Sequence, residues 1–342
     1  MTRYTALTKV VITGSLGLIG MACSRFFLEK GYDVIGIDND MRRIFFGESA
    51  SVADGVDCLE DYKNYKHIFC DIRNSDISDY VEDSDLIIHC AAQPSHDWSY
   101  KDPMLDFDVN AVGTLNLLEA ARTKAPDAMF IYLSTNKVYG DRPNSFNLIE
   151  DNTRYRQRDN LGVSEQMSVD TCVHSIFGVS KLSADLLVQE YGRNLGIKSA
   201  VLRCGCLTGS DHKGAELHGF LAYLAKCVRD KRPYTVYGYK GKQVRDNIHA
   251  DDVASCINLL FERGNLYGEV FNIGGSFENN VSMLEAIRYF EDMFDNKLNY
   301  EISNKNRTGD HKWYITDMSK FKSYFPDWTP KYSYEKLMRC FL

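Results

Sequence analysis

The sequence predicts an α/β fold in which helices cover both faces of a parallel sheet. Two patterns in the N-terminal half predict it. Short apolar runs alternate with helical stretches, and the runs are apolar at consecutive positions rather than at every second one. Both faces of such a strand avoid water, as in a parallel sheet whose crossover helices lie on both sides. We therefore expect a doubly wound arrangement, in which helices connect parallel strands.

Five apolar runs are predicted to be strands, namely Lys9–Thr13, Asp33–Ile37, His67–Cys70, Asp85–Cys90 and Ala128–Leu133. Between several of them apolar residues recur with the period of a helix, which predicts helices at Leu18–Lys30 and Val109–Lys124. A helix at Ile176–Leu195 and a strand at Ser199–Leu202 continue the alternation.

The pattern becomes less regular after Cys204. Helices are expected at Glu216–Lys231, Asp251–Glu262 and Met283–Phe294, with short strands at Tyr234–Tyr237 and Val270–Ile273. We expect a large lobe over residues 1–204 and a smaller α/β lobe over residues 205–342, with residues 244–275 partly returning to the first lobe. Two stretches, Asp40–Lys66 and Asp141–Asp170, are expected to be loop insertions, the second being either a lid or an ordinary surface loop.

The composition argues against several classes of protein. Forty basic and 47 acidic residues among 342 give a formal net charge of −7, so neither nucleic acid nor an anionic membrane is expected as the main partner. No apolar run reaches the roughly 18 to 20 residues of a membrane-spanning helix. The ten cysteines are scattered without CxxC spacing, so we expect reduced thiols, no metal site and a cytoplasmic protein.

A glycine-rich turn joins the first predicted strand to the first predicted helix. Gly14, Gly17 and Gly20 follow the strand at intervals of three residues. In such a turn the first glycine permits the bend, the second lets the backbone approach a pyrophosphate, and the third lets helix and strand pack closely. The helix N-terminus then presents unpaired N–H groups to the phosphates. The pattern favours a Rossmann-type site for a dinucleotide.

The second predicted strand is followed by Asp38. A carboxylate there can accept hydrogen bonds from the adenosine ribose and repels a 2′-phosphate, so we expect NAD rather than NADP. Arg42 and Arg43 follow closely and leave NADP open. Asp71 and Ile72, just past the third strand, are expected to border the adenine.

Further motifs follow the later strands: His89–Gln93, Ser134–Asp141, Gly178–Lys181, Arg245–His249 and Asn272–Gly275. Together with the glycine turn they make the chain resemble the extended short-chain dehydrogenase/reductases over nearly its whole length. The similar branch is that of the nucleotide-sugar epimerases and dehydratases. Within it the chain most resembles the CDP-tyvelose (CDP-paratose) 2-epimerases, through Ser134–Asp141, Gly241–Asp246 and Arg154–Tyr155.

The resemblance implies NAD as the cofactor and a homodimer or larger homo-oligomer. The helices at Val109–Lys124 and Ile176–Leu195 are the expected interface. The cofactor-binding residues that it implies are Gly14, Leu16, Gly17, Leu18, Ile19, Gly20, Asp38, Asn39, Asp71, Ile72, Ala91, Ala92, Gln93, Asn110 and Lys181.

The resemblance also implies three catalytic positions. A Ser or Thr hydroxyl orients the sugar, a Tyr exchanges a proton with the sugar hydroxyl, and a Lys one helical turn later lowers the pKa of that Tyr and holds the nicotinamide ribose. Thr135 and Lys181 occupy two of these positions, but Phe177 stands where the Tyr is expected. Phe177 is an engineered replacement, a natural residue in an enzyme that moves the proton elsewhere, or a sign of lost catalysis.

Several side chains are alternatives for the proton transfer: His96, Glu165, Tyr139, His174 and Lys181. His96 is favoured, because the segment after the fourth strand borders the nicotinamide in this family and imidazole titrates near neutrality. An exposed loop histidine without a catalytic role is the alternative interpretation.

Asn136 and Lys137 narrow the expected reaction. Sugar 4,6-dehydratases of this branch carry Asp-Glu at these positions, because eliminating water requires a general acid and a base at neighbouring carbons. Epimerisation requires only that a hydride leave and return on the other face. We therefore expect an NAD-dependent epimerase that inverts carbon 2 of a CDP-hexose. The alternatives are a carbon-4 epimerase, another sugar-nucleotide oxidoreductase, or a catalytically silent relative that binds NAD or a nucleotide sugar.

Arg245 and Arg307 match family positions that clamp the diphosphate, a task that suits a planar, permanently charged guanidinium. The other substrate-binding residues implied by the resemblance are Ser95, Lys137, Cys206, Glu216, His218, Gly219 and Tyr237. Core packing is an equal expectation for Tyr237.

Overall fold

A seven-stranded parallel sheet forms the centre of the larger lobe. The computed structural model describes residues 8–214, 219–306 and 308–342. The strands pair in the order β12-β8-β5-β4-β1-β2-β3, and every pairing is parallel. Their bounds are β1 Lys9–Thr13, β2 Asp33–Ile37, β3 Tyr65–Ile68, β4 Leu86–His89, β5 Met129–Thr135, β8 Ser199–Cys204 and β12 Tyr267–Ile273. The predicted parallel sheet is confirmed.

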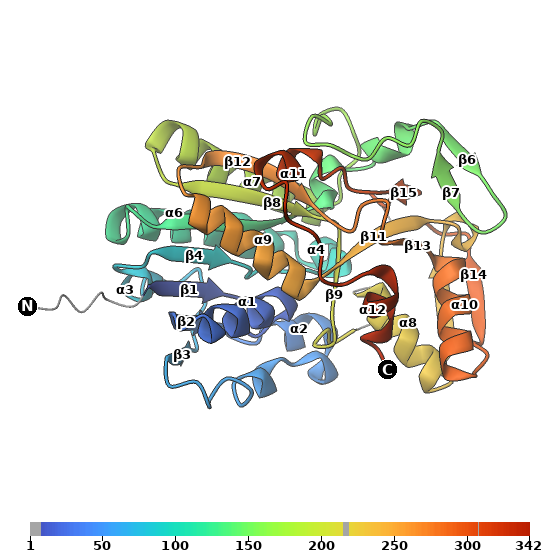
Figure 1. Ribbon diagram of the computed structural model, residues 1–342, viewed down its shortest axis with the longest axis horizontal. Coiled ribbons are helices and arrows are strands. Elements are labelled where there is room, and N and C mark those ends of the chain that lie inside the picture. Colours follow the sequence, from blue (N-terminus) through green and yellow to red (C-terminus); the bar gives the residue numbers. More distant parts are fainter. Residues whose placement is uncertain (1–7, 215–218, 307) are drawn as a thin grey trace, which may run out of the picture.

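Helices cover both faces of this sheet (Figure 1). One face packs against α1 (Leu18–Glu29) and α9 (Ala250–Arg263), and the other against α3 (Ile77–Val81), α6 (Gly113–Lys124) and α7 (Ile176–Leu195). Along β1, Val10 and Ile12 are buried in the first of these layers and Val11 in the second. Successive side chains of a strand point to opposite faces, so a strand covered on both sides is apolar at consecutive positions.

Local capping explains why two of the helices begin where the sequence predicts. At the start of α7 the Ser175 hydroxyl accepts a hydrogen bond of 3.0 Å from the backbone N–H of Gly178. At the start of α10 (Met283–Phe294), Ser282 and Glu285 form a reciprocal capping box. Such caps satisfy N–H groups that have no partner within the helix. The left-handed Gly196 then ends α7.

The helix expected at Val109–Lys124 differs at its start. Asp108–Val112 form a π-helical turn, and the α-helix begins only at Gly113. Within that turn the Asn110 amide accepts a hydrogen bond from the backbone N–H of Gln93 and donates one to the Ser180 hydroxyl. Hydrophobic periodicity cannot predict this turn, because partners distant in the sequence form these bonds.

Both expected insertions contain short regular elements. Asp40–Lys66 includes the helix α2 (Arg42–Phe46), and Asp141–Asp170 includes a hairpin of β6 (Leu148–Glu150) and β7 (Tyr155–Gln157). The hairpin is fastened to the smaller lobe, because the Tyr155 N–H donates to the Lys242 carbonyl oxygen at 3.0 Å. These elements depend on tertiary contacts rather than on an apolar period.

The smaller lobe has its own hydrophobic core (Figure 1). It contains α8 (Phe220–Arg229), α10 and α12 (Tyr334–Arg339), together with β10 (Tyr234–Tyr237) paired to β14 (Tyr300–Ser303). A second small sheet joins the lobes through β9 (Cys206–Thr208), β11 (Val244–His249), β13 (Asn280–Ser282) and β15 (Trp313–Tyr314). Because β12 returns to the main sheet, a boundary after residue 204 with a partial return over residues 244–275 remains our proposal for the domains.

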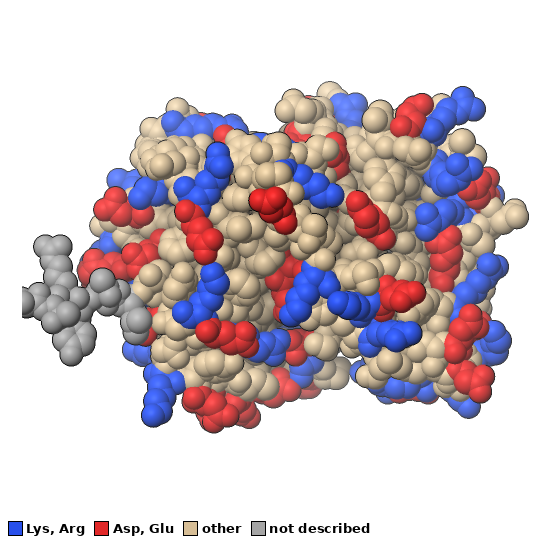
Figure 2. All heavy atoms as spheres, in the orientation of Figure 1, with Lys and Arg blue, Asp and Glu red and all other residues tan. Residues whose placement is uncertain are grey.

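Three short helices complete the described elements used below: α4 (His96–Lys101), α5 (Pro103–Phe107) and α11 (Ser319–Tyr324). All ten cysteines are free thiols. In the described part of the chain, no helix is long and apolar enough to cross a membrane. On the face shown in Figure 2, basic and acidic side chains are interspersed.

Candidate active site

Two cavities meet at the carboxyl end of the parallel sheet. The first, of about 400 Å³, lies beyond the ends of β1, β2, β4 and β5, and the second, of about 310 Å³, extends into the smaller lobe. Thr135, Phe177 and Cys206 line both cavities and therefore mark their junction. Open α/β sheets bind ligands beyond the carboxyl ends of their strands. The two cavities thus form one elongated site.

The three glycines of the first turn have different surroundings. A Cβ at Gly14 would lie 2.6 Å from the Ala91 nitrogen, and a Cβ at Gly20 would lie 2.0 Å from the Gly14 oxygen. At Gly17 the nearest atom would be 3.4 Å away, and this residue lines the first cavity. Gly17 is also the N-cap of α1, and its helix carries no side-chain cap among the described residues. The first N–H groups of α1 are therefore available to a phosphate.

Two carboxylates lie at the other end of the first cavity. Asp38 follows β2 and accepts a hydrogen bond of 3.1 Å from the backbone N–H of Leu16, while burial raises the pKa of its carboxyl group. Asp71 accepts a hydrogen bond of 3.0 Å from the Asn39 amide. Arg42 lines this cavity as well, but its guanidinium donates to the Lys213 carbonyl oxygen at 2.7 Å. A glycine cradle with a carboxylate beyond it fits a dinucleotide that has a free adenosine ribose.

Most of the predicted cofactor residues line the first cavity: Gly14, Gly17, Leu18, Ile19, Gly20, Asp38, Asn39, Asp71, Ile72, Ala91, Ala92 and Lys181. Leu16, Gln93 and Asn110 do not, and the structure does not support direct contact through their side chains. The Leu16 side chain packs in the hydrophobic core. Gln93 and Asn110 are buried behind the cavity wall, where they bond to each other and to Asp106.

Lys181 lies one helical turn after Phe177 on α7. Its ammonium group donates to the Leu133 carbonyl oxygen at 2.9 Å and lies 4.3 Å from the centre of the Tyr132 ring. Burial lowers the pKa of Lys181 to about 8. The same helix therefore presents two groups to the site: the Phe177 ring, and the Lys181 amino group, whose protonated form is disfavoured by burial.

The Phe177 ring contacts an imidazole. His96 lies at the start of α4, and its ring centre is 4.7 Å from that of Phe177. Phe177 lines both cavities, whereas His96 lines the second, together with Thr135 and Asn136. The position of the missing tyrosine is thus bordered by a group that can exchange a proton.

A partly buried cluster of charges lies beside these residues in the second cavity. The Asp310 carboxylate contacts the Lys137 ammonium at 2.9 Å and the Arg245 guanidinium at 2.8 Å. Burial opposes the ionisation of Asp310, but the charges of Lys137 and Arg245 outweigh it and hold its pKa well below its usual range. Burial also lowers the pKa of Lys137. The cluster carries one more positive than negative charge, which suits an anionic ligand.

A comparison of the sequence with known protein families agrees with the glycine-rich turn and the elongated site. The chain matches the NAD dependent epimerase/dehydratase family over residues 10–274. The chain belongs to this family. It is therefore an enzyme of the nucleotide-sugar epimerase and dehydratase type with NAD as its cofactor.

Members of the family with different reactions resemble this chain. A CDP-paratose 2-epimerase of Salmonella typhi is 33% identical over 337 residues, covering 95% of each chain. A dTDP-glucose 4,6-dehydratase of Escherichia coli is 27% identical and covers 97% of this chain and 91% of its own. The structure of a UDP-glucuronic acid 4-epimerase from Bacillus cereus, in complex with UDP-glucuronic acid and NAD, has a TM-score of 0.82 at 27% identity and covers 97% of each chain.

Five of the predicted substrate residues line the second cavity: Lys137, Cys206, Gly219, Tyr237 and Arg245. The predicted catalytic residue Asn136 lines it as well. Burial raises the pKa of the Cys206 thiol to about 11. Glu216, His218 and Arg307 lie outside the described residues.

Two predicted site residues, Ser95 and Glu165, form hydrogen bonds with backbone N–H groups in this structure. Ser95 is buried, and its hydroxyl caps α4 by accepting a hydrogen bond from the Trp98 N–H at 3.3 Å. Glu165 accepts a hydrogen bond of 2.6 Å from the Asn272 N–H on β12. Neither residue lines the first or the second cavity, so the structure supports neither substrate contact by Ser95 nor proton transfer by Glu165.

The rival proton groups Tyr139 and His174 also lie outside both cavities. The Tyr139 hydroxyl is buried and donates to the Asn272 amide oxygen at 2.8 Å. One His174 ring nitrogen lies 2.9 Å from the Val169 carbonyl oxygen. No residue of 141–170 lines either cavity, which favours an ordinary surface insertion over a lid.

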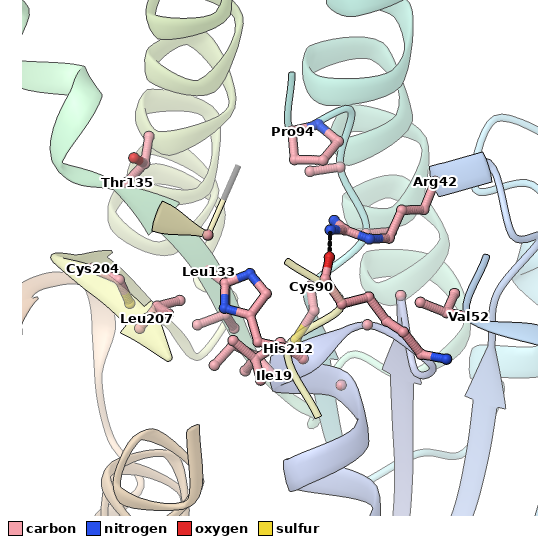
Figure 3. A pocket seen from close by; sticks show the side chains of 18 of the residues that line it. Ile19, Arg42, Val52, Cys90, Pro94, Leu133, Thr135, Cys204, Leu207 and His212 are labelled. Atoms are coloured by element: carbon pink, nitrogen blue, oxygen red, sulfur yellow. Dashed lines mark hydrogen bonds between the residues drawn. The ribbon is translucent and has the colours of Figure 1, made fainter. Parts of the chain in front are cut away.

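Sequence reasoning missed a segment that crosses the first cavity. Residues 211–213 follow β9, and His212 projects into the cavity (Figure 3). Asp211 pairs with Arg25 on α1, Lys213 pairs with Asp54, and the Arg42 guanidinium donates to the Lys213 carbonyl oxygen. Only the tertiary fold brings these partners together, because the residues of all three pairs are more than 150 positions apart in the sequence. The described residues contain no group of three or more His, Cys, Asp or Glu side chains that could hold a metal ion.

Proposed function

We propose that the enzyme inverts carbon 2 of a CDP-hexose through transient oxidation by bound NAD. The observation that carries the proposal is the pair Asn136–Lys137, which follows Thr135 at the junction of the cavities and supplies no carboxylate. Asp310 lines the second cavity, but its depressed pKa keeps it ionised, so it is a poor general acid for eliminating water. The 33% identity with the CDP-paratose 2-epimerase supports carbon 2 and the cytidine nucleotide.

Each residue at the junction has a proposed part in this reaction. NAD, when bound, supplies the hydride acceptor and donor. The Thr135 hydroxyl orients the reacting sugar hydroxyl, and Lys181 holds the nicotinamide ribose. Arg245 binds the diphosphate, with Asp310 as its partner until the substrate competes for the guanidinium. Lys137 adds a positive charge beside it.

The test is turnover of a panel of CDP-, UDP-, dTDP-, GDP- and ADP-hexoses by the NAD-loaded protein, followed by NMR of the sugar protons. We expect a change at carbon 2 with a CDP-hexose. Inversion only at carbon 4 would establish the carbon-4 epimerase, which the Bacillus cereus structure supports. Binding of nucleotide sugars without any product would establish the silent relative.

A substrate with deuterium at carbon 2 tests the chemistry separately. Hydride transfer returns the deuterium to the same carbon, so the product keeps its label in ordinary water. Removal of the hydrogen as a proton would exchange it with solvent. Loss of label with retained turnover would contradict the oxidation mechanism while leaving the epimerase assignment intact.

We also propose that the enzyme is a homodimer. The helices α5, α6 and α7 and the π-helical turn lie side by side, and they carry the exposed apolar residues Met104, Phe107, Val112, Leu115, Val179 and Leu186. Exposed apolar side chains on neighbouring elements favour an interface, and a second copy of the same helices would make a symmetric one.

A further inference from the structure

The loop before α4 holds His96 against Phe177. The Gln93 amide donates to the Ser95 carbonyl oxygen at 2.8 Å and to the Asp106 carboxylate at 2.6 Å. The amide oxygen of Gln93 accepts a hydrogen bond from the Ser95 N–H in return. The Ser95 hydroxyl then caps the helix that His96 begins. This buried network fixes the backbone from Gln93 to Ser95, just before His96. The imidazole therefore has a defined position against the Phe177 ring.

Several other ionisable side chains line the two cavities near the junction, and some of them form ion pairs or hydrogen bonds there. Lys137 and Arg245 both pair with Asp310. The Cys206 thiol has a pKa raised to about 11 by burial, so it is a poor proton acceptor at neutral pH. Lys181 donates to the Leu133 carbonyl. Among the residues that the structure describes, the second cavity is also lined by the titratable side chains Tyr223, Tyr234 and Tyr237, from α8 and β10 of the smaller lobe.

Charged side chains on the described elements next to His96 include Asp97 and Lys101 on α4 itself, Asp106 on α5, Lys137 after β5, and Lys181, Asp185, Glu190 and Arg193 on α7. Asp106 is buried and bound to the Gln93 amide. The imidazole, the side chain that most often serves as a general acid and base, thus lies on the cavity wall against the Phe177 ring.

We propose that His96 replaces the family tyrosine as the group that takes and returns the proton of the sugar hydroxyl. As the carbon–hydrogen bond breaks and the hydride leaves for the cofactor, the oxygen–hydrogen bond also breaks and its proton moves to a neutral imidazole nitrogen. The products of this half-reaction are a keto sugar and an imidazolium ion. When the hydride returns to the other face of the carbon, the imidazolium returns its proton to the oxygen, so the cycle consumes neither protons nor electrons.

The inference rests on the proposed hydride chemistry but not on the identity of the nucleotide or the carbon. Four variants test it: His96→Gln, Phe177→Tyr, the double variant, and His174→Gln as the matched control outside the cavities. We expect His96→Gln to lower kcat by about 10² to 10⁴, with His174→Gln unchanged. A tyrosine at 177 should restore the double variant by at least about tenfold, because a phenol there can exchange the proton. Retention of more than a tenth of kcat by His96→Gln would overturn the proposal.

Two further measurements exclude a merely structural role. In the unmodified enzyme, kcat should fall at acid pH because the His96 imidazole becomes protonated. This fall should be absent from the double variant Phe177→Tyr/His96→Gln. An unchanged fall in the double variant would overturn the proposal. The ¹⁵N resonances of His96 should shift with a nucleotide sugar but not with CDP alone. This NMR readout needs no turnover, so it separates a failure of the His96 proposal from a failure of the proposed function. Absence of a sugar-dependent shift with every nucleotide sugar would overturn the proposal even if the protein proved catalytically silent.

Discussion

Gly17 and Gly20 belong to one turn, but the structure gives them different tasks. A Cβ at Gly20 would overlap the Gly14 carbonyl, whereas a Cβ at Gly17 would meet only an ordinary contact at 3.4 Å on the wall of the cofactor cavity. Gly20 thus allows α1 to pack closely on the sheet, and Gly17 allows a pyrophosphate to approach the backbone.

We therefore predict that Gly17→Ala weakens NAD binding about tenfold, or by about 1.4 kcal/mol, with little change in Tm. The matched variant Gly20→Ala is expected to lower the free energy of unfolding by about 1 to 3 kcal/mol through overpacking. Calorimetric titration with NAD and urea unfolding of both variants check this. Equal losses of stability in the two variants would contradict the assignment.

Among the helices, α7 has two different faces. Ala184 and Val188 pack in the core, while Val179 and Leu186 are 44% and 45% exposed. An exposed apolar row on a helix next to the similarly exposed α5 and α6 favours burial against a second copy. The proposed dimer places this row at the interface.

We predict that Leu186→Glu converts the dimer to a monomer, because a carboxylate would lose its hydration in an apolar interface. Size-exclusion chromatography with light scattering measures the mass. Ile302→Glu, at a residue of similar exposure on the edge strand β14, is the control and should leave the mass unchanged. A monomeric unmodified chain would refute the dimer.

In the whole molecule, Asp310 joins parts that are far apart in the sequence. Its carboxylate ties Lys137, just after β5 of the main sheet, to Arg245 on β11 of the joining sheet. The folded-state pKa of Asp310 lies below its unfolded value, so the native state binds fewer protons than the unfolded state as pH falls. Its contribution to stability is therefore full above about pH 4 and is lost as pH falls through the folded-state pKa.

We predict that Asp310→Asn lowers the free energy of unfolding at pH 7 by about 3 kcal/mol, because two cations then lack their counter-charge. The difference from the unmodified protein should shrink at acid pH, where the carboxylate of the unmodified protein also becomes neutral. Urea unfolding at several pH values measures it, with Asp292→Asn at an exposed position of α10 as the control. A difference that grows toward acid pH would contradict the sign.

Local sequence by itself determined the main sheet, its covering helices and the cofactor cradle. These features depend on interactions between near neighbours: apolar runs that need cover on both faces, serine caps beside helix starts, and glycines spaced for one turn. The sequence also marked Phe177 and His96, although it could not place one against the other.

The tertiary structure alone decided which polar side chains share the site. It brought Asp310 to Lys137 and Arg245, placed residues 211–213 on the wall of the first cavity, and gave Glu165 and Ser95 hydrogen-bond partners outside both cavities. It also set the π-helical turn at Asp108–Val112 and the short strands β9 and β15. The physical reason is the same in each case: these arrangements depend on hydrogen bonds and ion pairs between residues far apart in the chain, whose geometry no local period encodes.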